Sequence, residues 1–208
     1  MLVDASAPLA RRGLLVMAAL LASGAGASAR DGSDAAGFIH SLGDRTVALL
    51  DRFGHDRKAL TSGMAELLDE AIDISLVARL ALGRSWRQAN EAQRRDYVEL
   101  CRRYILATMA QRFTSYKGSE RFMVTGTRLA GDDTIVGSRI DYVGYPPLLL
   151  EWRVREAGRP MIVDVVVEGV SMVLTFRSEF DSIVARRGID GLLRELTAQT
   201  GAASAEGG

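Results

Sequence analysis

The sequence has little of the chemistry that most enzymes and metalloproteins use. It contains one cysteine, two histidines and equal numbers of basic and acidic residues, 26 of each. With Cys101 alone, no disulfide can form within the chain, so packing must hold the fold. Proteins that bind nucleic acid usually carry a marked basic excess. The balanced charge therefore predicts no nucleic-acid partner.

The candidate catalytic and metal-ligating residues are isolated from one another. His40 and His55 have no Cys, His or Asp partner at the spacing of zinc ligands. The segment Gly169–Ser171 begins like the G-x-S-x-G motif of hydrolases, but Val173 occupies the second glycine position. Cys101 lies on a helical pattern and should pack as a small hydrophobic residue. We therefore expect no enzyme, no metal and no cofactor.

The one long apolar run lies at the beginning of the chain. Gly13–Ala22 follows Arg11 and Arg12 and precedes Ala27–Ala29, the pattern of a secretory signal peptide cleaved after Ala29. The run is shorter than the roughly 20 residues that a transmembrane helix needs. Two adjacent arginines leave both the Sec and the twin-arginine export routes open. The pattern predicts an exported, soluble protein that begins at Arg30.

The first half of the mature chain reads as helices. Apolar residues recur every three or four positions, which is the period of one helix face. Asn90 and Gln93 have the spacing of a capping box. The predicted helices cover residues 34–53, 57–72, 76–82 and 90–116.

The second half changes to strands and then returns to helices. Four β-rich segments separated by short turns predict an antiparallel meander over residues 121–130, 134–143, 148–155 and 161–167. Gly169 ends the last strand, and two helices follow over 173–187 and 189–197, separated by Gly188. The fold class is therefore α+β, with helices against one face of a curved sheet. We predict a signal peptide over 1–29, one domain over 30–200 and a disordered tail over 201–208.

Two separated segments carry a family resemblance. The wording DVVVEGVSMVLTFRSEF, closed by GIDGLLREL, resembles the C-terminal signature of the MlaC family, also called the toluene-tolerance family. The segment ARLALGRSWRQANEAQRRDYV (Ala78–Val98) resembles the second signature of this family, in which a Gly-x-x-Trp turn precedes a long helix. The likeness extends from about Phe38 to Leu196.

The resemblance implies more than the residues alone predict. It implies an NTF2-like cradle that encloses an apolar lipid pocket, a periplasmic location and a role in outer-membrane lipid asymmetry. The implied activity is the shuttling of phospholipid between membrane complexes. The implied partners are an inner-membrane ABC transporter with its substrate-capturing subunit, and an outer-membrane lipoprotein–porin complex.

The alternating apolar faces of the strands supply candidate lining residues. Acyl chains need only apolar contact, since each buried methylene contributes about 0.8 kcal/mol. Arg177 is a candidate contact for a phosphate head group or a partner, or a structural ion-pair residue. The twelve candidate lipid-binding residues are Val136, Ile140, Tyr142, Leu148, Leu150, Trp152, Val163, Val165, Val167, Met172, Val173 and Phe176.

Three alternatives remain at this point. The phrase QRFTSYKGSERF is closer to a subgroup associated with hopanoid-biosynthesis operons, so the ligand is a phospholipid or a hopanoid. Asp164 stands in an otherwise apolar strand, where an NTF2-like enzyme would place a base for an apolar substrate. Finally, the apolar residues would fill a solid core if the protein were a structural adaptor.

Overall fold

The structure, a computed structural model, describes residues 32–113, 116 and 118–205. The predicted signal peptide and its cleavage site lie outside the described residues, and so do the last three residues of the predicted tail. Within the described part of the chain, no helix is long and apolar enough to cross a membrane.

The helical first half follows the predicted boundaries closely. Asp56 and Asp73 accept hydrogen bonds from the backbone of Ala59 and Leu76, each at 2.9 Å, and so cap α2 and α3. The predicted capping box is confirmed, because Asn90 and Gln93 bond each other's backbone N–H at the start of α4. The elements are α1 (Ser33–Phe53), α2 (Arg57–Ala71), α3 (Ile74–Leu82), the 3-10 turn η1 (Gly83–Arg87) and α4 (Glu91–Phe113).

A single antiparallel sheet follows, with its strands in sequence order. The α+β class is confirmed, but the sheet has five strands where the sequence predicted four. The extra strand was missed because two residues after Gly169 are too few to show an alternating pattern. The strands are β1 (Arg121–Ala130), β2 (Asp133–Tyr142), β3 (Tyr145–Glu156), β4 (Pro160–Val167) and β5 (Val170–Ser171).

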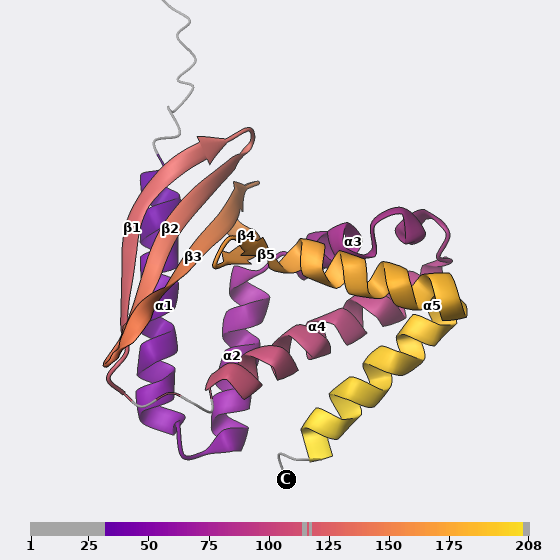
Figure 1. Cartoon of the computed structure of the whole chain (residues 1–208), viewed down its shortest axis with the longest axis horizontal. Coiled ribbons are helices and arrows are strands. Elements are labelled where there is room, and N and C mark those ends of the chain that lie inside the picture. Colours follow the sequence, from indigo (N-terminus) through magenta and orange to yellow (C-terminus); the bar gives the residue numbers. More distant parts are fainter. Residues whose placement is uncertain (1–31, 114–115, 117, 206–208) are drawn as a thin grey trace, which may run out of the picture. The chain divides into compact units, whose positions relative to one another are not determined.

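The two predicted C-terminal helices form one element with a kink. α5 (Met172–Ala205) turns sharply at Gly188, whose φ of 67° and ψ of −179° are not helical. The helix covers residues 201–205, within the segment predicted as a disordered tail. Gly188 therefore separates two helical arms, as its position in the sequence predicted (Figure 1).

The helices cover the sheet unevenly (Figure 1). α1 packs on β1, β2 and β4, while α2, α3 and α5 reach the sheet mainly at β4. The central strand β3 is not among the main helix contacts of the described residues. Side chains of β3 still reach α1, because Val154 and Trp152 belong to the same packed group as Ile39.

Three groups of buried residues hold the fold together. The largest joins α3, α4 and α5 around Tyr97, Phe180 and Leu192. A second joins α1 to the sheet through Ile39, Val136 and other residues. A smaller third group lies between α1 and α2. The candidate site is built on the inner face of the sheet, and several of its residues belong to the second group.

Candidate functional site

The strand register arranges the inner face of the sheet in four rows. Row one contains Thr134, Val154 and Ile162; row two contains Val136, Trp152 and Val165; row three contains Ser138, Leu150 and Val167; row four contains Phe122, Ile140 and Leu148. The register therefore brings seven of the twelve predicted lining residues onto one face.

Burial is greatest in row one and least in row four. Row one is fully buried. Rows two and three mix buried residues with the half-buried Trp152, Val165 and Val167, and all of row four is half-buried. Tyr142, beyond row four and after a register shift, is exposed. The inner face is thus closed at row one and open at row four, and apolar throughout except for Thr134 and Ser138.

The remaining predicted lining residues lie elsewhere. Val163 falls at a register shift, so that Ile162 rather than Val163 takes the position opposite Val154. Val173 is buried in the helical group, where Phe176 also packs, and Met172 is half-buried at the start of α5. The sequence analysis placed Val163, Val165 and Val167 on one face by counting every second residue, and such counting cannot reveal a bulge.

β1 supplies inner-face residues that the sequence analysis missed. Phe122 and Val124 are half-buried and pack against the same group as Trp152. In the structure burial alternates at the beginning of β1, but the sequence does not show it, because Phe122, Met123 and Val124 are all apolar.

Two devices fix the aromatic side chains on this face. The indole Nε1 of Trp152 donates a hydrogen bond to Ser138 Oγ at 2.8 Å, and Ser138 is only 2% exposed. The ring of Phe122 meets the indole edge-on, with 6.4 Å between the centroids. On its other side, Phe122 fills the space that a side chain at Gly43 would take, since a Cβ there would lie 2.3 Å from the ring.

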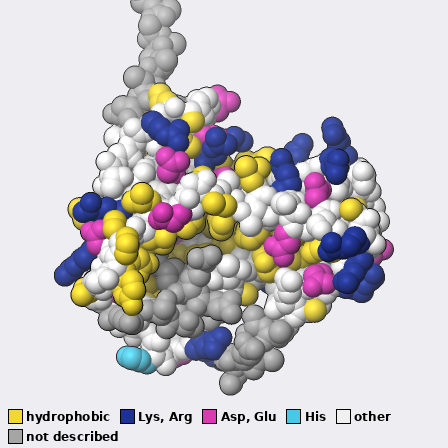
Figure 2. All heavy atoms as spheres, in the orientation of Figure 1, with side chains coloured by type: hydrophobic (Ala, Val, Ile, Leu, Met, Phe, Trp, Pro, Cys, Tyr) yellow, Lys and Arg dark blue, Asp and Glu magenta, His cyan; other side chains and the backbone are white. Residues whose placement is uncertain are grey.

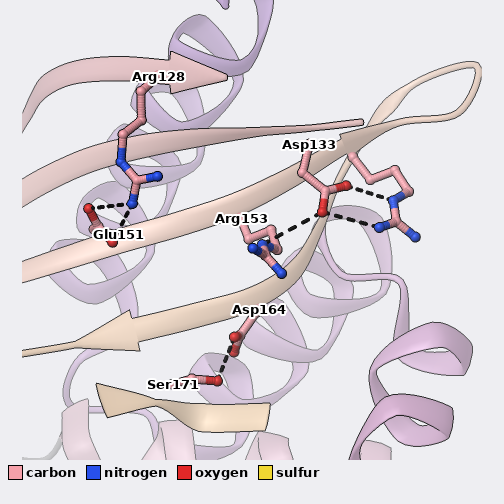
Figure 3. A network of polar contacts seen from close by, with 7 residues as sticks. Arg128, Asp133, Glu151, Arg153, Asp164 and Ser171 are labelled. Atoms are coloured by element: carbon pink, nitrogen blue, oxygen red, sulfur yellow. Dashed lines mark hydrogen bonds and ion pairs between the residues drawn. The ribbon is translucent and has the colours of Figure 1, made fainter. Parts of the chain in front are cut away.

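Asp164 lies on the other side of β4 and has a structural partner (Figure 3). Its carboxylate accepts hydrogen bonds from Ser171 Oγ at 2.6 Å and from the backbone N–H of Val173 at 3.1 Å. Ser171 Oγ in turn accepts from the N–H of Leu174. Asp164 therefore anchors the first turn of α5, which accounts for a carboxylate in this strand without a catalytic role.

The outer face of the sheet carries an ionic network (Figure 3). Asp133, which is 5% exposed, pairs with Arg155 at 2.7 Å and with Arg153 at 3.6 Å. Arg128 pairs with Glu151 at 3.1 Å across the strands. These ion pairs make the outer face of the sheet charged, in contrast to its apolar inner face.

Arg177 has a structural partner as well. Its guanidinium donates to the carbonyl oxygen of Leu80, near the end of α3, through Nε at 2.8 Å and also through Nη2. It lies over Gly83, where an added Cβ would be 3.2 Å from Nε. This contact joins the two segments that resemble the family signatures. The proposed ion pairs with neighbouring carboxylates are not among the contacts that the structure gives for Arg177.

Aromatic packing strengthens the same junction. Trp86 meets Tyr97 edge-on at 6.5 Å between centroids, and Tyr97 meets Phe180 in the same way at 6.0 Å.

Burial raises the pKa of the Cys101 thiol to about 12, and burial likewise raises the pKa of Tyr97. Cys101 is therefore a packing residue in the helical group, with its thiol protonated at neutral pH.

Two surface depressions of the described residues lie away from the predicted pocket. One of about 280 Å³ lies between the two arms of α5, and one of about 760 Å³ lies beside β5 and the first turns of α5. On the inner face of the sheet, the described residues instead present half-buried apolar side chains. Figure 2 shows hydrophobic side chains in a band that runs from the sheet toward the helices.

Comparison with known proteins agrees with this architecture. A solved structure of a phospholipid-binding protein from Ralstonia solanacearum, in complex with a phospholipid, matches with a TM-score of 0.72 and 21% sequence identity. The match covers 82% of this chain and 99% of the other. The family model described as MlaC protein matches residues 45–198, which include both signature segments and the whole sheet. The chain therefore belongs to the MlaC protein family.

Proposed function

We propose that this protein is a periplasmic lipid-binding shuttle, with the inner face of the sheet as its lipid site. Membership of the MlaC family and the phospholipid complex of the Ralstonia solanacearum protein support this proposal. The observation that carries it is the set of half-buried apolar side chains in row four of the inner face, Phe122, Ile140 and Leu148.

The chemistry of this face suits acyl chains better than a polar substrate. Ile140, Leu148 and Val167 offer apolar surface that remains half-exposed, which is costly unless another apolar group covers it. Each methylene that an acyl chain buries there would contribute about 0.8 kcal/mol, so recognition needs no polar contact. A phosphate head group would remain toward the open end, which predicts tolerance of different head groups.

The proposed partners follow from the family. The shuttle would exchange phospholipid with an inner-membrane ABC transporter, through its substrate-capturing subunit, and with an outer-membrane lipoprotein–porin complex. Direction would be determined by these partners, because a passive carrier only equilibrates according to relative affinities.

Neighbouring residues on opposite faces of β3 provide a matched test. Leu148 is half-buried on the inner face, whereas Leu149 is 54% exposed and lies on the other face. Purified wild-type protein and variants would be incubated with vesicles containing labelled phosphatidylethanolamine, separated from them, and assayed for bound lipid. Leu148→Asp should lose at least about tenfold in captured lipid, because a charge on the site opposes acyl burial.

Leu149→Asp introduces the same charge one residue away and should capture lipid like the wild type. Equal capture by wild type and both variants would contradict the proposed site. An absence of capture by the wild-type protein would contradict the proposed function itself.

A further inference from the structure

We propose that Trp152 forms a fixed wall in the lipid site and limits the length of acyl chain that the site accepts. This inference rests on the proposed function and assigns a specificity-determining role to one side chain. It starts from the position of Trp152 in row two, next to the fully buried row one.

The first step concerns the space on either side of the indole. Beyond Trp152, the buried residues Val154 and Ile162 pack with Ile39 of α1 and leave no apolar surface open. Before it, Leu148 and Val167 are half-buried, and Leu150 beside them is 9% exposed. Acyl chains that enter from the open end at row four would therefore meet the indole before they reach the closed end.

The second step concerns the rigidity of the indole. Its hydrogen bond to Ser138 fixes the ring orientation, because Ser138 itself is buried and Trp152 has a single N–H donor. Phe122 supports the ring from β1 and is itself held against Gly43 of α1. A side chain held directly from β1 and β2 cannot easily swing aside to admit a longer chain.

The third step concerns the chemistry of such a wall. The indole, held edge-on by a second ring, gives the site an apolar ring whose only N–H is already paired with Ser138. Replacing it with a smaller apolar residue would lengthen the apolar surface toward row one. The protein would then retain longer chains better, because each extra methylene buried adds to the affinity.

The experiment is a competition between two phosphatidylethanolamines that differ only in acyl length by two methylenes per chain. The purified protein is loaded from vesicles that contain both lipids in equal amounts, and the bound lipids are extracted and quantified by mass spectrometry. Trp152→Leu should raise the ratio of longer to shorter lipid by about tenfold relative to wild type. Ser138→Ala, which removes only the anchor of the indole, should shift the ratio in the same direction and by less.

The other tryptophan supplies the control. Trp86 packs in the helical group against Tyr97 and Arg94, away from the inner face. Trp86→Leu should leave the ratio unchanged even if it lowers stability. If Trp152→Leu does not fold, the lipid ratio of Ser138→Ala tests the proposed wall. A wild-type ratio in every folded variant would overturn the proposed wall, whereas a wild-type protein that loads neither lipid would instead contradict the lipid-carrier function.

Discussion

At the scale of single residues, Asp164 is best explained by its partners. Its carboxylate bonds Ser171 and the N–H of Val173, and so anchors the start of α5. Asp164→Ala should lower the free energy of unfolding by roughly 1–2 kcal/mol, the usual effect of losing such a cap. Urea denaturation measures this loss.

The carboxylate of Asp141, on the exposed outer face beside Arg139, offers a comparison. Asp141→Ala should lower the free energy of unfolding by less than about 1 kcal/mol, because exposed ion pairs contribute little to stability.

Asp164→Asn should bind and transfer lipid like the wild type. Loss of function in a stably folded Asp164→Asn variant would revive the enzymatic interpretation of this residue.

Cys101 gives the protein a predictable weakness at alkaline pH. Burial raises the pKa of its thiol to about 12 in the folded chain, from an ordinary value of 9.0. Between these values the unfolded chain releases the proton and the folded chain keeps it, so rising pH favours unfolding. Each such group contributes a slope of up to about 1.4 kcal/mol per pH unit.

Urea denaturation at several pH values above 9 would measure this slope. Cys101→Ala should flatten it, although the raised pKa of the buried Tyr97 leaves part of the dependence in place. The native thiol should also resist alkylation at pH 8 until denaturant is added. Rapid labelling of the folded protein would show that the thiol is accessible, against this account.

At the scale of elements, the kink of α5 depends on one glycine. Gly188 has φ 67° and ψ −179°, a region of backbone conformation that is essentially restricted to glycine. Gly188→Ala should therefore destabilise the protein by roughly 1–3 kcal/mol, or straighten α5 and release Leu192 and Leu196 from the helical group. Thermal unfolding and circular dichroism distinguish these two responses.

A second glycine gives the matched control. Gly37 lies within α1, is exposed, and has open space where a Cβ would be added. Gly37→Ala should stabilise the protein by about 0.5–1 kcal/mol, because alanine favours a helix more than glycine does. Destabilisation of equal size in both variants would contradict the role assigned to the kink.

The elements also show what the sequence could predict. Three local signals located the helices well: the helix periodicity, the capping box that begins at Asn90, and the break at Gly188. The two-residue strand β5 and the bulge at Val163 could not be found, because both are defined by pairing with a neighbouring strand. Asp164 was ambiguous for the same reason, since its partners Ser171 and Val173 become neighbours only when the sheet forms.

At the scale of the whole molecule, the two signature segments have a common physical purpose. Arg177 bonds the end of α3 beside Gly83, and the rings of Trp86, Tyr97 and Phe180 continue the same junction. These residues hold α3, α4 and α5 together. The seven predicted lining residues lie on the inner face of the sheet, which is the lipid site that we propose.

Whether this inner face holds a lipid is the central question for the account. The most direct measurement is native mass spectrometry of the mature protein purified from the periplasm, followed by extraction and analysis of any bound lipid. We predict a mass increase that matches one diacyl phospholipid per chain, with mixed head groups. A bound hopanoid would support the proposed site but identify a different ligand. A chain that remains without lipid, even after incubation with phospholipid vesicles, would contradict the account.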